Sequence, residues 1–284
     1  MAKIDVFNGD ADGICALLQL RKSEVGHGDE SPVLVTGVKR DIALVARVQA
    51  GAADTVTVLD VSYDKNRDGV NRLLNRGATV RYFDHHRATE VVSHAAFEVH
   101  IDPAPDVCTS LIVDRFLGGR QRPWAVVGAF GDNLEKSAMR AAEPLGRTHE
   151  DLERMAELGR YLNYNAYGRT VDDLFFAPAA LFEALLPYED PLDFVRDDPA
   201  FETLQGGYRD DIERARGIVP TVDEKACAVL VLPDEPWAAR VSGVYANQLA
   251  SGSPDRAHAL MTLREDGAYV VSVRAPVARP DGAD

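Results

Sequence analysis

The feature that most constrains the fold is an alternation of strand-like and helix-like segments near the start of the chain. Short runs rich in β-branched and aromatic residues alternate with stretches whose apolar residues have helical spacing. The strand-like runs are Ile4–Phe7, Val33–Val38, Thr55–Leu59 and Thr79–Phe83, and the helix-like runs are Ile14–Arg21, Ile42–Val48 and Val70–Asn75. This alternation is typical of βαβ units, so we expect an α/β fold with a parallel sheet and helices on both of its faces.

The rest of the chain predicts more helices and a second unit. Helices are expected at Asp106–Leu117, from Pro123, and after Thr148, where Asp151 falls in the first turn. Prolines recur after residue 177, and a charged helical stretch, YRDDIERARGIV, follows. The segments ACAVLVLP, VSGVYANQLA and RAHALMTLREDGAYVVSVRAP then predict a strand, a helix and a hairpin that turns at 265–267.

This change in composition predicts three regions. We expect a larger domain over residues 1–185, a helical linker over 186–222, and a smaller mixed α/β domain over 223–284. The length of 284 residues and the hydrophobic content of 46% suit a protein with a sizeable core. Three cysteines that are far apart in sequence, Cys15, Cys108 and Cys227, predict buried free thiols and no disulfide framework.

The net charge and the hydropathy of the chain limit the kinds of partner that we expect for it. The net charge of −14 disfavours a protein that grips long duplex nucleic acid, because such binding needs a basic face. The first residues are interrupted by charge, and no apolar stretch has the length to span a bilayer. We therefore expect a cytoplasmic protein without a membrane partner. The oligomeric state is left open, with a homodimer among the alternatives.

Acidic residues and histidines follow the predicted strands at the points where they end. They are Asp10 and Asp12, Asp60, the triplet Asp84-His85-His86 and, after a later apolar stretch, Asp132. The carboxyl ends of parallel strands share one edge of the sheet, so these groups should converge. Clustered carboxylates repel one another unless a cation compensates them. Carboxylates with imidazole favour Mn²⁺, with Mg²⁺ as the alternative, and two such cations could activate water and hold a phosphoryl group.

Taken together, these motifs resemble a known family. NGDADG, VLD, DHH and a distal GD, in this order over residues 4–135, are similar to the motifs of the DHH phosphoesterase superfamily. That superfamily includes RecJ-like single-strand exonucleases, oligoribonucleases that act on very short RNA, and manganese-dependent pyrophosphatases. Residues 225–276 more weakly resemble its accessory substrate-binding domain, called DHHA1. A lone Asp-x-Asp-Gly is more often a turn or a helix cap, so the metal interpretation depends on all four motifs together.

The resemblance implies roles for individual residues. Asp10 and Asp60 would hold one cation, and Asp60 would bridge to a second cation. The ligands of the second cation would be Asp12, Asp60, His85 and Asp132.

The resemblance also implies residues that act on the substrate. His86 would contact the phosphate or donate a proton to the leaving oxygen, and Asp84 would orient the imidazole and the backbone. Arg274 would meet a substrate phosphate across the cleft. Arg87 is a further phosphate contact candidate, as are Lys39 and Arg40, with solvated surface as the alternative for each.

Two features depart from the family pattern. Where the family supplies a histidine or an additional aspartate before the Asp-x-Asp pair, this chain has Val6 and Asn8. Asn8 is either a neutral metal ligand or a turn former, so the first cation site should be weak or filled by water. The glycine-rich loop with a histidine that follows in the family is not found in VARPDGAD after Arg274, which indicates either a truncated chain or natural loss.

The function expected from these residues is that of a metal-dependent phosphoesterase. Its substrate would be a short oligonucleotide or a related small phosphoester, attacked by water that two cations activate. One alternative is a catalytically weak family member that serves as a binding or scaffold protein, which Asn8 and the missing loop suggest. A second is a manganese pyrophosphatase, although the basic second domain of that branch is barely present here.

Overall fold

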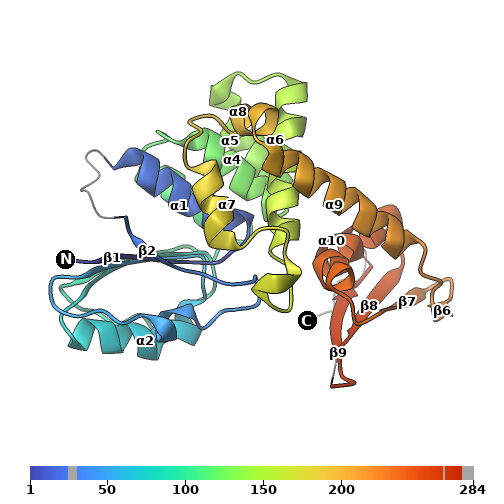
Figure 1. Cartoon of the computed structure of the whole chain (residues 1–284), viewed down its shortest axis with the longest axis horizontal. Coiled ribbons are helices and arrows are strands. Elements are labelled where there is room, and N and C mark those ends of the chain that lie inside the picture. The colour runs from blue at the N-terminus through green and yellow to red at the C-terminus, as the bar shows by residue number, and fades with distance from the viewer. Residues whose placement is uncertain (25–30, 265, 277–284) are drawn as a thin grey trace.

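The computed structural model describes residues 1–24, 31–264 and 266–276, which form a larger α/β unit and a smaller one (Figure 1). The larger unit is built on a five-stranded parallel sheet with the order β2-β1-β3-β4-β5. Its strands are β1 (Lys3–Phe7), β2 (Val33–Val35), β3 (Thr55–Leu59), β4 (Thr79–Asp84) and β5 (Phe97–Ile101).

Helices cover both faces of this sheet, as the sequence predicts. Phe7, Leu59 and Phe83 point into a core on the side of α1, whereas Val6 and Val58 point into a second core on the side of α2. In Figure 1 the two helices lie on opposite sides of the sheet. The helical elements of this unit are α1 (Ala11–Ser23), η1 (Leu44–Arg47), α2 (Tyr63–Asn75), α3 (Thr109–Phe116), α4 (Arg122–Gly131), α5 (Glu135–Ala142), η2 (Glu143–Leu145), α6 (His149–Asn165), η3 (Val171–Asp173), α7 (Pro178–Leu185) and α8 (Pro191–Asp197).

The smaller unit has a four-stranded mixed sheet with the order β6-β7-β8-β9. The parallel pair β7 and β8 is joined by α10, which packs on the sheet through Val241 and Trp237. The elements are α9 (Pro199–Arg216), β6 (Val222–Asp223), β7 (Cys227–Leu232), α10 (Pro236–Gly252), β8 (Ala257–Leu263) and β9 (Tyr269–Arg274). The mixed α/β fold expected here is confirmed.

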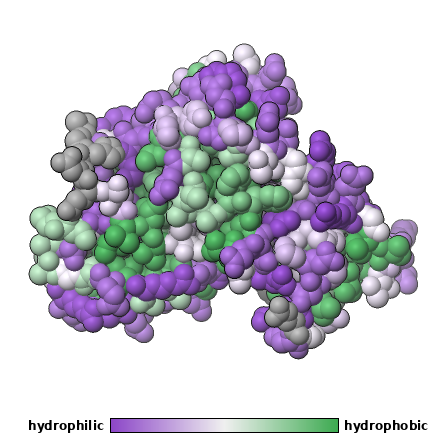
Figure 2. Space-filling model, in the orientation of Figure 1, coloured by the Kyte–Doolittle hydropathy of each residue, from purple (hydrophilic) through white to green (hydrophobic). Residues whose placement is uncertain are grey.

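The charged helix α9 joins the cores of the two units. Its first half contributes Phe201 and Leu204 to the core around α1, and its second half contributes Ile212 and Ala215 to the core around α10. Hydrophilic residues cover much of the face shown in Figure 2, and hydrophobic residues gather over the middle of the larger unit. Among the described residues, no helix has both the length and the apolar character that crossing a membrane requires.

Several local predictions are confirmed. Thr148 and Asp151 form a reciprocal capping box at the start of α6. Proline stands in the first turn of α4. Strands β8 and β9 pair antiparallel, and Gly267 has a φ of 78° in the turn between them. Glu265, the first residue of the predicted turn, and the final segment 277–284 lie outside the described residues.

Other local predictions are wrong. The helix expected at Ile42–Val48 is only the 3₁₀ turn η1, since its β-branched residues lower helix propensity and its Leu44 and Val45 are buried in the core instead. The second strand ends at Val35, because as an edge strand it pairs only with β1. The sequence patterns also missed β5, another edge strand, whose half-buried pattern gives a weak signal. Of the three thiols, Cys15 and Cys108 are buried, whereas Cys227 is half-buried.

Candidate metal centre

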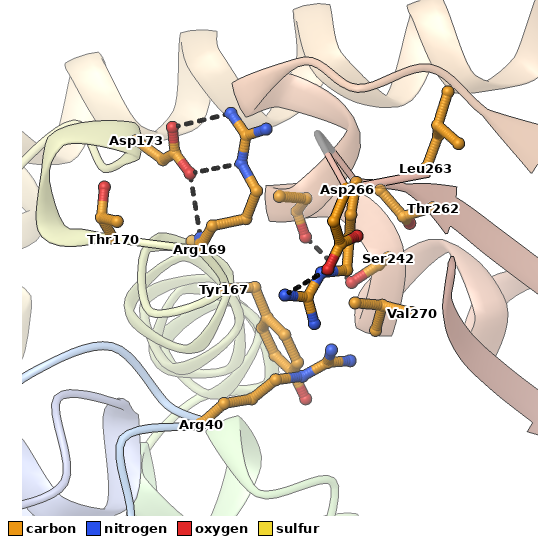
Figure 3. Close-up of a pocket in the computed structure, with 13 residues that line it drawn as sticks. Arg40, Tyr167, Arg169, Thr170, Asp173, Ser242, Thr262, Leu263, Asp266 and Val270 are labelled. Atoms are coloured by element: carbon orange, nitrogen blue, oxygen red, sulfur yellow. Dashed lines mark hydrogen bonds and ion pairs between the residues drawn. The ribbon is translucent and has the colours of Figure 1, made fainter. Parts of the chain in front are cut away.

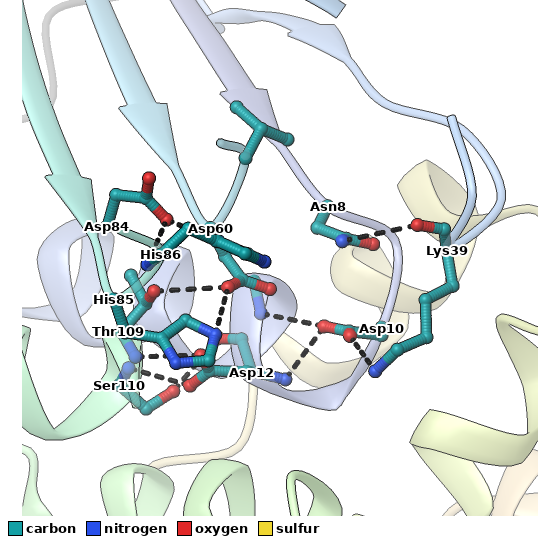
Figure 4. Close-up of polar contacts among 12 residues, drawn as sticks. Asn8, Asp10, Asp12, Lys39, Asp60, Asp84, His85, His86, Thr109 and Ser110 are labelled. Atoms are coloured by element: carbon teal, nitrogen blue, oxygen red, sulfur yellow. Dashed lines mark hydrogen bonds and ion pairs between the residues drawn. The ribbon is translucent and has the colours of Figure 1, made fainter. Parts of the chain in front are cut away.

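The predicted acidic and imidazole groups meet at the carboxyl edge of the parallel sheet (Figure 4). Strands β1, β3 and β4 are adjacent in the sheet, so the residues that follow them become neighbours in space. Ligand atoms of Asp12, His85 and Asp132 lie within 4.8 Å of one another, as do those of Asp60, His85 and His86. The donors of the first group, with Asp60 beside them, fit a divalent cation that prefers oxygen ligands and one imidazole.

Asp12 is fixed by the start of α3. Its two carboxylate oxygens accept hydrogen bonds from the backbone amides of Thr109 and Ser110, both at 2.7 Å. The Ser110 hydroxyl returns a bond to the Asp12 carbonyl at 2.8 Å. Two backbone amides at a helix N-terminus therefore hold the Asp12 carboxylate in one position. Thr109 and Ser110 fall in a helix that the sequence predicts, but the sequence patterns do not assign them to the centre.

Asp60 lies at the centre of the cluster in a strained conformation. Its φ is 57°, a left-handed value that is rare outside glycine. The Asp60 Oδ1 atom accepts a hydrogen bond from Thr109 Oγ1 at 3.1 Å and lies 3.3 Å from His85 Nε2. Asp132, which ends α4, is followed by Asn133 with a φ of 60°. Asp60 and Asn133 thus both have a left-handed backbone conformation, at the points where the acidic side chains meet.

Burial, together with repulsion within the cluster, raises the pKa of two carboxyl groups. Burial, together with the charges of Asp10, Asp12 and Asp132, raises the pKa of Asp60 well above its ordinary value. Burial and the neighbouring Asp12 raise the pKa of Asp132 to about 7. Both groups thus favour a proton when no cation is bound, and a divalent cation would compensate the same repulsion.

Asp84 orients His86. The Asp84 Oδ1 atom accepts from the His86 backbone amide at 3.2 Å and contacts His86 Nδ1 at 2.6 Å. The Asp84 Oδ2 atom accepts from the amide of Tyr63 at 3.1 Å. Asp84 is fully buried, whereas the His86 side chain is 43% exposed. A buried carboxylate thus holds an imidazole whose other side faces solvent.

Asp10 contacts a lysine as well as the start of α1. Its Oδ1 atom caps α1 by accepting from the amides of Asp12 and Gly13, both at 3.1 Å. Its Oδ2 atom lies 2.5 Å from the ammonium nitrogen of Lys39. Asp10 belongs to neither group of metal-capable atoms found among the described residues. The nearby Asn8 places its Nδ2 3.5 Å from the Lys39 carbonyl, while its buried Oδ1 has no hydrogen-bond partner among those residues.

A basic pocket lies beside the centre, and both units contribute to its lining. A cavity of about 450 Å³ is lined by Lys39, Arg40, Tyr167 and Arg274, together with Ile42, Gly243 and Ser272. Asn247 holds Arg274 in place, because its Oδ1 atom accepts from Arg274 Nε at 2.7 Å. Arg40 and Tyr167 also line a neighbouring cavity of about 580 Å³ (Figure 3). Arg274 and Arg40 therefore face space between the two units.

Arg87 shows no comparable placement. Its side chain is exposed, and it makes no hydrogen bond or ion pair with any other residue in the described ranges. Sequence reasoning missed Asn163, whose carboxamide holds Lys39, and Tyr167, over whose ring the Lys39 ammonium lies. The only signal for them was an aromatic-rich stretch that equally suits packing between domains.

Comparison with known proteins identifies the fold of the chain. No family model matches the chain, and no curated protein matches it either. Solved structures do match. One is the DHH domain of a member of a family of ribosomal proteins, with a TM-score of 0.63, 13% identity, and coverage of 98% of this chain and 75% of the other.

Two further solved structures have the same architecture. The exonuclease RecJ bound to manganese has a TM-score of 0.55 and 19% identity, with coverage of 92% of this chain and 75% of RecJ. The pGpG-specific phosphodiesterase PggH from Vibrio cholerae has a TM-score of 0.54 and 14% identity, with coverage of 99% of this chain and 85% of PggH. This chain has the fold of the DHH superfamily. The resemblance drawn from four short motifs is thereby confirmed at the level of the DHH fold.

Proposed function

We propose that this chain is a metal-dependent phosphoesterase that hydrolyses phosphodiester bonds in short oligonucleotides or related small phosphoesters. The observation that carries the proposal is the convergence of Asp12, Asp60, His85 and Asp132 at the carboxyl edge of the DHH-fold sheet. The RecJ structures with this fold hold Mn²⁺ or Mg²⁺. An imidazole among oxygen ligands favours Mn²⁺ here, with Mg²⁺ as the alternative.

Each part of the proposed reaction has a residue in place. A bound divalent cation would lower the pKa of a water molecule and offset charge on the phosphoryl group. His86, held by Asp84 through Nδ1, leaves its other ring nitrogen for a proton transfer or a phosphate contact. Arg274 and Arg40 line the pocket in which a substrate phosphate would lie. A planar guanidinium is suited to a phosphate, and a pocket of about 450 Å³ has the size of a small-molecule site.

The first test is hydrolysis of a short RNA dinucleotide with and without Mn²⁺. We expect manganese-dependent cleavage by the wild-type chain and at least about a 100-fold loss in Asp60→Ala, because a ligand matters more than the outer groups that support it. Asp68→Ala, which removes an exposed carboxylate on α2, is the matched control and should retain activity. Mn²⁺ binding without cleavage of any short phosphoester would favour the binding or scaffold alternative instead.

A pyrophosphatase activity is the remaining alternative. It shares the proposed metal chemistry, so pyrophosphate belongs in the same assay. Cleavage of pyrophosphate in preference to the dinucleotide would contradict the oligonucleotide assignment while leaving the metal centre intact.

A further inference from the structure

The ammonium group of Lys39 lies within the acidic cluster. It contacts Asp10 Oδ2 at 2.5 Å and donates to Asn163 Oδ1 at 3.0 Å. It also lies 5.5 Å from the centre of the Tyr167 ring, a cation–π distance. The Lys39 side chain is only 24% exposed, and Asp10 is almost completely buried. This contact is therefore much less screened by solvent than a surface ion pair.

The position of Lys39 is fixed by the backbone as well as by its side chain. Its amide donates to the carbonyl of Ala166, just after α6, at 2.9 Å. Asn163 is near the end of the same helix. The C-terminal end of α6 thus holds both the backbone amide and the ammonium group of Lys39. Carbonyls at that end of a helix also favour a positive charge.

Asp10 has little capacity left for a metal ion. Its Oδ1 atom caps α1 and its Oδ2 atom is paired with Lys39. The one lone pair that these contacts leave on Oδ2 lies beside the Lys39 ammonium, so a cation bound there would meet a positive charge at close range or displace it. The neighbouring residues add little to a cation site here. Asn8 offers only a neutral amide oxygen, and Val6 has no side-chain ligand atom and is fully buried among apolar residues.

The balance of charge at the centre also favours one divalent cation over two. The four carboxylates of Asp10, Asp12, Asp60 and Asp132 have a formal charge of −4 together, which two divalent cations would already neutralise. Lys39 would then add a partly buried charge of +1 without compensation, and such a charge is unfavourable. One divalent cation with Lys39 gives +3 against −4, which leaves no surplus positive charge before the substrate binds.

We propose that the Lys39 ammonium takes the place of one cation, so that the centre binds a single divalent cation through Asp12, Asp60, His85 and Asp132. This inference rests on the proposed metal centre and changes its composition. Lys39 would supply the fixed positive charge beside the basic pocket that the second cation supplies in a two-metal site. Val6 and Asn8, which stand where the family supplies a histidine or an additional aspartate, are consistent with this replacement of a metal ion by a lysine, because no second cation needs those ligands.

The test is the stoichiometry of Mn²⁺ binding to the full chain, measured by calorimetry and by electron paramagnetic resonance. We expect one Mn²⁺ per wild-type chain and no spectrum of a spin-coupled pair at saturating Mn²⁺. Lys39→Ala frees Asp10 Oδ2, so we expect it to bind a second Mn²⁺ with a spin-coupled spectrum. Arg40→Ala removes an equal charge from the adjacent exposed residue and should still bind one.

The outcomes separate this inference from the proposed function. Two spin-coupled Mn²⁺ ions in the wild-type chain would overturn the lysine substitution and leave the phosphoesterase proposal standing. A stoichiometry of one in both Lys39→Ala and the milder Lys39→Gln, with thermal unfolding unchanged, would also overturn it, because the missing ligands alone would then exclude the second ion. A wild-type chain that binds no Mn²⁺ would overturn the proposed metal centre itself.

Discussion

At the scale of single residues, the centre depends on side chains that fix other side chains. Asp84 is fully buried, and within the described part of the chain its carboxylate accepts from the backbone amides of Tyr63 and His86 and contacts the His86 ring. A carboxylate in this position sets the tautomer of the imidazole and its direction. Its role in the proposed reaction is therefore to position His86 for the substrate.

Asp84→Asn tests this positioning role. The amide has only one acceptor oxygen, so it cannot serve both His86 and the Tyr63 amide as the carboxylate does. We expect dinucleotide hydrolysis to fall about 10–100-fold while the Mn²⁺ stoichiometry stays the same. In a His86→Ala background the same substitution should add almost no further loss. Equal losses in both backgrounds would show that Asp84 acts through general stability instead.

The sequence predicts the identities of the clustered residues but not their partners. Asp12, Asp60, His85 and Asp132 are found from their places after strands and an apolar helix, because the parallel sheet aligns the strand ends. Lys39 was only a phosphate contact candidate beside Arg40. Its contact with Asp10 spans 29 residues and depends on where α6 ends, which no local pattern encodes.

At the scale of elements, the predicted strands and helices follow periodicity where one face is clearly buried. The central strands β1, β3 and β4 show that pattern and were predicted within a residue or two. Of the edge strands, β2 was predicted to extend beyond Val35 to Val38, and β5 was missed, because both strands are only partly buried and pair on one side. The turn η1 shows tertiary packing overriding an apparently helical spacing.

Strand β8 carries a buried histidine that makes a prediction about pH. His258 is 4% exposed, and its Nδ1 atom has no hydrogen-bond partner among the described residues. Burial, with a smaller effect of Arg256, lowers the pKa of His258 below its ordinary value. The neutral ring is thus favoured in the folded state, and its contribution to stability is full above the unfolded pKa of about 6.5. That contribution is lost as the pH falls through the lower folded pKa.

We therefore expect the free energy of unfolding to fall more steeply in the wild-type chain than in His258→Gln below about pH 6.5. The slope difference should not exceed about 1.4 kcal/mol per pH unit, the value for uptake of one proton. Denaturant unfolding at a series of pH values measures it, and titrating groups common to both chains cancel. Parallel curves for the two proteins would contradict the assignment to His258.

At the scale of the whole molecule, one arginine connects the two units. Arg240 on α10 donates from Nε to Asp211 Oδ2 on α9 at 2.8 Å and to the Tyr164 hydroxyl on α6 at 3.3 Å. It also donates to the carbonyl of Asp173, and its guanidinium lies 4.6 Å from the centre of the Phe175 ring. Asp211 is buried and depends on this cation and on Tyr164 for compensation.

Arg240→Met tests whether this contact holds the smaller unit against the larger one. Removing the guanidinium leaves the Asp211 carboxylate buried without its main cation, which costs on the order of 3–5 kcal/mol. We expect hydrogen exchange to speed up in β7 and β8 well before it does in β1 and β3, because the larger unit keeps its own cores. Arg214→Met is the matched control, since that arginine lies 3.9 Å from the same carboxylate but is 58% exposed. If hydrogen exchange rose equally in both sheets, Arg240 would be stabilising the whole molecule as one cooperative unit. If Arg214→Met sped up exchange as much as Arg240→Met does, the effect would come from net charge and not from the buried contact.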